Sequence, residues 1–172
     1  MTSTTAVQVA SPVERAWAVL DGVPDPEVPA VSVRELGIVR DVIAQTDGSL
    51  EIVLTPTYSG CPATEVIADD VRAAIVAAGL GVPRITLRRA PAWTTDWISS
   101  EGRRKLAAHG IAPPGPVDRQ PVSPLRFVAP NVACPRCGSR ATERLSAFGS
   151  TACKALHRCL ACREPFEHFK PI

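Results

Sequence analysis

Apolar side chains recur at helical spacing in several stretches of the first 110 residues. Over residues 12–20 they share one face, and Ser11 followed by Glu14 gives the capping-box pattern of a helix start. A second apolar stripe predicts a helix over residues 63–78. A third helix, rich in basic side chains, is expected over residues 96–109.

Strand-like segments lie between these helices. Residues 38–44 and 50–55 flank Asp47-Gly48, a pair that hairpin turns prefer, and residues 83–89 alternate between apolar and polar side chains. The order helix, hairpin, helix, strand predicts the α+β fold class. We expect a small α/β sandwich with helices on a three- to four-stranded mixed sheet.

The cysteines are distributed unevenly, because five of the six fall in the last 39 residues. Two C-x-x-C knuckles, Cys134/Cys137 and Cys159/Cys162, have the spacing of a four-cysteine zinc ribbon. Zinc would supply folding free energy that so short a tail cannot obtain from its core. Four protein ligands close the shell, so a structural rather than a catalytic zinc is predicted. An iron site with the same ligands and a dithiol redox pair are the alternatives.

Composition divides the chain into three parts. Six of the 20 residues over 111–130 are proline, which predicts a semi-rigid linker between a domain at 1–110 and a zinc ribbon at 131–172. The first domain has a net charge of −3 (10 basic and 13 acidic residues), and residues 111–172 have +5 (9 and 4). This balance argues against nucleic-acid binding.

Hydropathy gives no sign of a membrane protein. No run approaches the roughly 18 apolar residues that a spanning helix needs. Residues 1–10 have neither the basic start nor the apolar run of a secretory signal, and a cytoplasmic location is therefore expected.

The sixth cysteine, Cys61, stands alone at the start of the helix over 63–78. A helix N-terminus stabilises a thiolate, so we expect a lowered pKa and a reactive Cys61. Asp25 and Glu27, on a Pro-flanked loop, and Thr57, after the second strand, are candidates to meet it at one rim of the sheet. An ordinary core cysteine with unrelated turn residues is the alternative. Cys153 is either a free thiol of the ribbon or a ligand that joins a metal cluster.

Several segments carry a family resemblance: Asp25-Pro-Glu-Val-Pro29, Leu36-Gly-Ile-Val39, Thr55-Pro-Thr-Tyr-Ser-Gly-Cys-Pro62 and Ala90-Pro-Ala-Trp93. They resemble the small α/β family of iron–sulfur assembly factors that includes SufT. In the tail, the two knuckles and Phe148-Gly-Ser-Thr-Ala-Cys-Lys154 resemble the PaaD-like family of the phenylacetyl-CoA monooxygenase (epoxidase) system.

The resemblance implies an accessory protein that is not catalytic alone and that matures iron–sulfur or diiron centres in aerobic phenylacetate degradation. Cys61 would be the functional thiol, with Asp25, Glu27 and Thr57 beside it, and would hold iron or an iron–sulfur cluster transiently. The implied partners are the oxygenase and reductase components. The sequence does not decide whether the chain also forms a homodimer through a sheet edge. A stoichiometric subunit of the oxygenase and a zinc-ribbon module that docks nucleic acid or protein are the alternatives.

Overall fold

The computed structural model describes residues 10–58, 60–115 and 132–172. The expectations about a leader at residues 1–9 and about most of the Pro-rich stretch, residues 116–131, lie outside the described residues. The division of the chain into domains stays a prediction.

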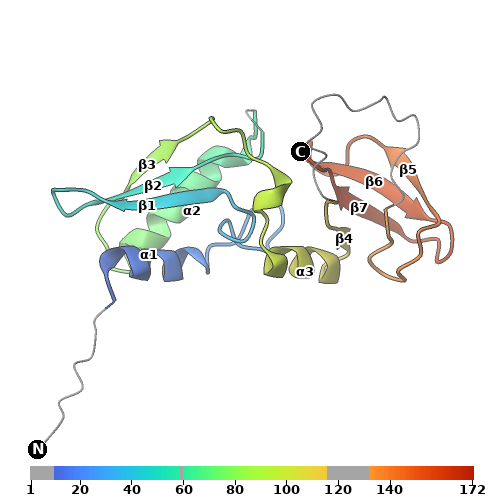
Figure 1. Ribbon diagram of the computed structural model, residues 1–172, viewed down its shortest axis with the longest axis horizontal. Coiled ribbons are helices and arrows are strands. Elements are labelled where there is room, and N and C mark those ends of the chain that lie inside the picture. The colour runs from blue at the N-terminus through green and yellow to red at the C-terminus, as the bar shows by residue number, and fades with distance from the viewer. Residues whose placement is uncertain (1–9, 59, 116–131) are drawn as a thin grey trace, which may run out of the picture.

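The first part of the chain forms a three-stranded mixed sheet in the order β1-β2-β3 (Figure 1). β1 (Val39–Ala44) and β2 (Leu50–Leu54) are antiparallel and joined by the expected hairpin turn. β3 (Arg84–Leu87) pairs parallel to β2, because α2 (Ala63–Ala77) crosses between them and returns the chain to the same end. The predicted mixed sheet is confirmed.

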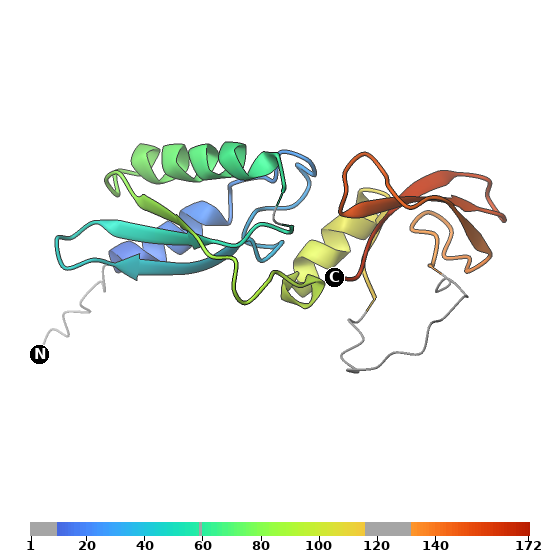
Figure 2. The same cartoon turned by 90° about the horizontal axis from the view of Figure 1, so that it is seen from above.

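Two helices form the second layer of this sandwich. α1 (Pro12–Leu20) begins at the predicted capping box, in which the side chains and backbone N–H groups of Ser11 and Glu14 bond reciprocally. α1 contacts both β1 and α2, and Figure 2 shows α2 running along the sheet. Between the layers lies a core of aliphatic side chains, among them Leu20, Ile52 and Ile75.

The prediction of a helix over residues 96–109 is wrong about where the helix begins. A single 3-10 turn, η1 (Thr95–Trp97), comes first, and α3 (Ser100–Ala108) begins only after Ile98 and Ser99 have taken extended backbone angles. The Ser99 side chain accepts the N–H of Gly102 and so caps α3. In the sequence, Ser99 could equally be a cap or an interior residue of the expected helix.

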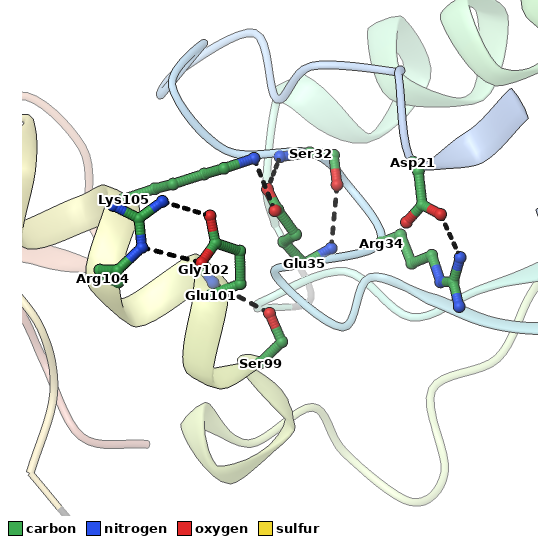
Figure 3. A network of polar contacts seen from close by, with 9 residues as sticks. All are labelled: Asp21, Ser32, Arg34, Glu35, Ser99, Glu101, Gly102, Arg104 and Lys105. Carbon is green, nitrogen blue, oxygen red and sulfur yellow. Dashed lines mark hydrogen bonds and ion pairs between the residues drawn. The ribbon is translucent and has the colours of Figure 1, made fainter. Parts of the chain in front are cut away.

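α3 is fixed to the segment that follows the Pro-flanked loop (Figure 3). Lys105 pairs with Glu35 at 2.6 Å, and the backbone N–H of Ser99 donates to the Glu35 carbonyl at 2.9 Å. A Cβ on Gly102 would lie 2.9 Å from that same carbonyl, so glycine permits the close approach. Glu35 is tied in turn to Ser32, whose N–H it accepts.

The second part of the chain is a four-stranded sheet in the order β4-β7-β6-β5. β5 (Thr142–Ser146), β6 (Lys154–Cys159) and β7 (Pro165–Phe169) are antiparallel neighbours. β4 (Ile111–Ala112) lies within the expected linker, yet it pairs parallel with β7. The start of the Pro-rich stretch is therefore part of the ribbon sheet, because its first two residues are apolar and precede the prolines.

The ribbon also packs directly on the first domain. Phe169 packs against Trp93 in a tilted arrangement, with ring centroids 6.0 Å apart, and the indole N–H of Trp93 donates to the Leu36 carbonyl. The Ile172 carbonyl accepts a hydrogen bond from the Thr95 N–H at 3.1 Å. Figure 1 shows this end of the chain beside the segment that leads into α3. Among the described residues, no helix has the length and hydropathy needed to cross a membrane.

Candidate metal centres

The four predicted ribbon ligands meet at one point. The sulfur atoms of Cys134, Cys137, Cys159 and Cys162 all lie within 4.8 Å of one another. Two of the S–S distances are 3.8 Å (Cys134 to Cys162) and 3.6 Å (Cys137 to Cys159). A tetrahedron with sulfurs about 2.3 Å from a central zinc ion has edges of about 3.8 Å, so the site fits zinc. The distances are far longer than a disulfide bond.

Local backbone geometry builds this site. In the first knuckle Gly138 follows the second sulfur with a φ of 75°, a backbone conformation that glycine adopts easily, and its N–H donates to the Cys134 carbonyl at 2.8 Å. In the second knuckle Arg163 takes the same left-handed region, with a φ of 67°, and bonds back to the Cys159 carbonyl. Each pair of thiols is therefore held by its own turn.

The second knuckle also prepares a thiolate. The backbone N–H of Cys162 points to the Cys159 sulfur at 3.5 Å. This interaction lowers the pKa of Cys159 to about 6, whereas burial and the neighbouring thiols raise the pKa of Cys162 to about 12. Without metal the knuckle therefore favours one thiolate, and the remaining ligands must lose their protons as zinc binds.

A second site lies where the first domain meets the ribbon. Here a pocket encloses about 20 Å³, and all four predicted residues line it: Asp25, Glu27, Thr57 and Cys61. Cys61 is half-buried, two residues before α2, and its carbonyl accepts bonds from the Thr64 N–H and hydroxyl. Leu36, Ile38 and Leu54 supply apolar wall. The structure brings these residues together, whereas their function and the activation of Cys61 stay predictions.

The carboxyl groups of the pocket are deeply placed. Asp25 is only 5% exposed, and its Oδ1 accepts the N–H groups of Glu27 at 3.0 Å and Val28 at 2.8 Å. Burial outweighs these bonds and raises the pKa of Asp25 above its usual value. Burial and the neighbouring charge of Asp25 raise the pKa of Glu27. Both groups would ionise more readily if a cation entered the pocket.

The ribbon contributes residues to this pocket that sequence reasoning did not assign. Cys153 and Phe169 both line it. Cys153 is 5% exposed, its sulfur lies 3.0 Å from the Thr151 hydroxyl oxygen, and burial raises its pKa. Next to it, Lys154 is 2% exposed and pairs with Glu167 at 3.0 Å. Cys153 lies just before β6, so no strand pattern in the sequence indicated that its side chain faces the first part of the chain.

Comparison with known proteins matches the two parts separately. Residues 14–87 match the family described as "Iron-sulfur cluster assembly protein", and residues 118–170 match the "PaaD zinc beta ribbon domain". An Escherichia coli (strain K12) protein, whose name describes it as a putative subunit of 1,2-phenylacetyl-CoA epoxidase, is 46% identical over 160 residues, which are 93% of each chain.

Two further relatives resemble the first domain. The Porphyromonas gingivalis (strain ATCC BAA-308 / W83) "Fe-S protein maturation auxiliary factor" is 35% identical over 83 residues, 48% of this chain and 78% of that protein. The crystal structure of a domain of unknown function, DUF59, from Bacillus anthracis is similar with a TM-score of 0.51 and 27% identity. It covers 55% of this chain and 91% of its own.

Proposed function

Because this chain belongs to the PaaD family, we propose that it is an accessory protein that loads metal into a phenylacetyl-CoA epoxidase. The likeness of its first domain to an Fe–S protein maturation factor supports a role in assembly rather than in oxidation of the substrate. In this proposal iron, or an iron–sulfur cluster, is cargo that the protein carries to the oxygenase or the reductase component.

The pocket around Cys61 is the observation that carries the proposal. It offers a half-buried thiol beside two carboxyl groups, which are donors for iron, and it lies apart from the four ligands of the ribbon. The ribbon site is closed by four thiolates, so a metal there would be held rather than passed on. A carrier needs the opposite property, a site from which the ion can leave.

The test replaces one atom of the pocket. The oxygenase and reductase are produced together with the wild-type chain or with Cys61→Ser, and iron per oxygenase and turnover of phenylacetyl-CoA are measured. We expect both to fall with Cys61→Ser to the level found without the accessory protein, while the ribbon keeps its zinc. Val82→Ala, at a residue that is 72% exposed, is the control and should leave both unchanged. Full iron loading with Cys61→Ser would contradict the proposal.

A second candidate function is a stoichiometric subunit of the oxygenase, which the name of the Escherichia coli relative favours. The two functions differ in what happens after loading. A maturation factor can be removed from the iron-loaded oxygenase without loss of turnover, whereas a subunit must co-purify at a fixed ratio. Turnover of loaded oxygenase before and after removal of this chain distinguishes them.

A further inference from the structure

The ribbon completes the pocket of the first domain. Cys153 and Phe169 belong to the core cluster of the first domain, whereas Cys134, Cys159 and Phe166 form the ribbon's own cluster. The Cys153 carbonyl accepts the N–H of Lys170 at 3.0 Å, which joins the start of β6 to the end of β7 at this interface. The Cys153 sulfur is therefore presented to the first domain by a rigid part of the ribbon.

We propose that Cys153 is the second sulfur ligand of the pocket, and that Cys61 and Cys153 hold one Fe(II) ion between the two domains, with an oxygen from Asp25 or Glu27. This inference rests on the proposed function, because it specifies the cargo and the ligands of the same site. The two thiols come from parts of the chain 92 residues apart and line one cavity. Their mixture with carboxylates selects thiophilic divalent ions over Mg²⁺ and Ca²⁺.

The cavity has room for one ion. About 20 Å³ is free in the pocket, and roughly 10–15 Å³ is enough to hold one water molecule. A single metal ion therefore fits without movement of the backbone around the pocket, and a single ion is the cargo that the inference assigns to the site.

The residues that line the pocket suit a cation. In the part of the chain that the structure describes, they include two carboxyl groups, Asp25 and Glu27, and no basic side chain. The nearby Lys154, next to Cys153 in the chain, is 2% exposed and pairs with Glu167 at 3.0 Å. A metal ion that enters the pocket therefore meets acidic donors, and the protons that its ligands lose on binding pass to the solvent.

The pocket differs from the ribbon in how far its donors are assembled. Within the described residues, the four ribbon cysteines are the group whose donor atoms already lie within 4.8 Å of one another. The donors of the pocket must rotate toward the ion before they bind it. This reorganisation weakens binding and makes release easier, as delivery requires.

The experiment uses full-length protein whose ribbon is saturated with zinc. One equivalent of Fe(II) is added without oxygen to the wild type, Cys61→Ser and Cys153→Ser, and the affinity and the iron-edge X-ray absorption are measured. We expect two sulfur ligands per iron in the wild type and one in each variant, with affinity at least about tenfold weaker in each. The iron edge does not report the zinc site.

The outcomes separate this inference from the proposed function. Loss of affinity and of one sulfur with Cys61→Ser but not with Cys153→Ser overturns the inference and leaves the proposed function standing. One sulfur or none in wild-type iron also overturns it. Because the wild-type sulfur count needs no substitution, the test holds even if Cys153→Ser disturbs the core. Cys153→Ala, checked by zinc content and circular dichroism, is the second variant.

Discussion

The ribbon takes its four sulfurs from two tight knuckles, whereas the pocket takes its donors from three distant segments of the chain. Each knuckle fixes two thiols by its own backbone bonds, and the four sulfur atoms are already placed for a tetrahedral ion. In the pocket, the Asp25 loop, the segment before α2 and the residue before β6 come together only in the folded tertiary structure. The ribbon site is thus assembled by local structure, whereas the pocket depends on packing between distant parts of the chain.

The pocket depends on the ribbon, but the zinc site of the ribbon does not depend on the pocket. The pocket needs the ribbon, because Cys153 and Phe169 belong to the core of the first domain. The four ribbon ligands, in contrast, include no residue of the first domain. Damage to the ribbon should therefore reach the pocket, whereas damage to the pocket should leave the zinc in place.

The largest effect is expected from Cys159→Ser, which removes a buried ribbon ligand. Structural zinc contributes about 10–16 kcal/mol of apparent binding free energy in small zinc domains, so loss of one thiolate should cost the ribbon its fold. We expect zinc per chain to fall towards zero and the amides of β5, β6 and β7 to lose protection from hydrogen exchange. Retention of one zinc after dialysis against a chelator would refute this. Cys61→Ser, the matched control, should keep one zinc per chain.

Phe169→Ala is expected to have the second largest effect, and it separates docking from zinc binding. Phe169 is 2% exposed and packs against Trp93, and truncation of a buried Phe costs about 3–5 kcal/mol. Because Phe169 lies in the core of the first domain, zinc content should stay at one per chain while the midpoint of urea unfolding falls. A parallel loss of zinc would show that the two sites are not separable.

The control for this truncation is Phe148→Ala in the same ribbon. Phe148 is 63% exposed, and the Lys170 ammonium lies over its ring, 4.6 Å from the centroid. Substitutions at such surface positions change the free energy of unfolding by about 0.5 kcal/mol or less. The same residue type is thus removed from inside and outside the interface.

The same contrast explains how much the sequence could predict. The ribbon ligands were readable because a C-x-x-C knuckle is a local pattern whose geometry depends on a few neighbouring residues. Asp25, Glu27, Thr57 and Cys61 could be grouped because the order of strands and helices places them at one rim. Cys153 could not be assigned to them, since its position depends on how the ribbon docks. The start of α3 was predicted too early, because the hydrogen bond by which Ser99 caps the helix depends on the folded backbone and cannot be read from the residue order.

The smallest effect, and the sharpest test of the pocket, is expected from Asp25→Asn. The asparagine Oδ1 can still accept the N–H groups of Glu27 and Val28, so the loop should keep its shape. Because burial raises the pKa of Asp25, the folded state binds more protons than the unfolded state above the ordinary carboxyl range. Ionised Asp25 therefore opposes folding at neutral pH, and stability falls as pH rises through the folded pKa.

Asp25→Asn should remove that opposition and yet weaken the site. At pH 7 we expect the zinc-loaded protein without iron to be as stable as the wild type or more stable by up to about 1 kcal/mol, measured by urea unfolding. Its Fe(II) affinity should fall about tenfold, because a neutral amide replaces a carboxylate oxygen. If Asp25→Asn keeps the stability of the protein and loses Fe(II) affinity, Asp25 serves binding rather than folding. If stability falls and Fe(II) affinity does not, Asp25 is a loop-forming residue, and Glu27 is left as the carboxylate that the ion could take from this pocket.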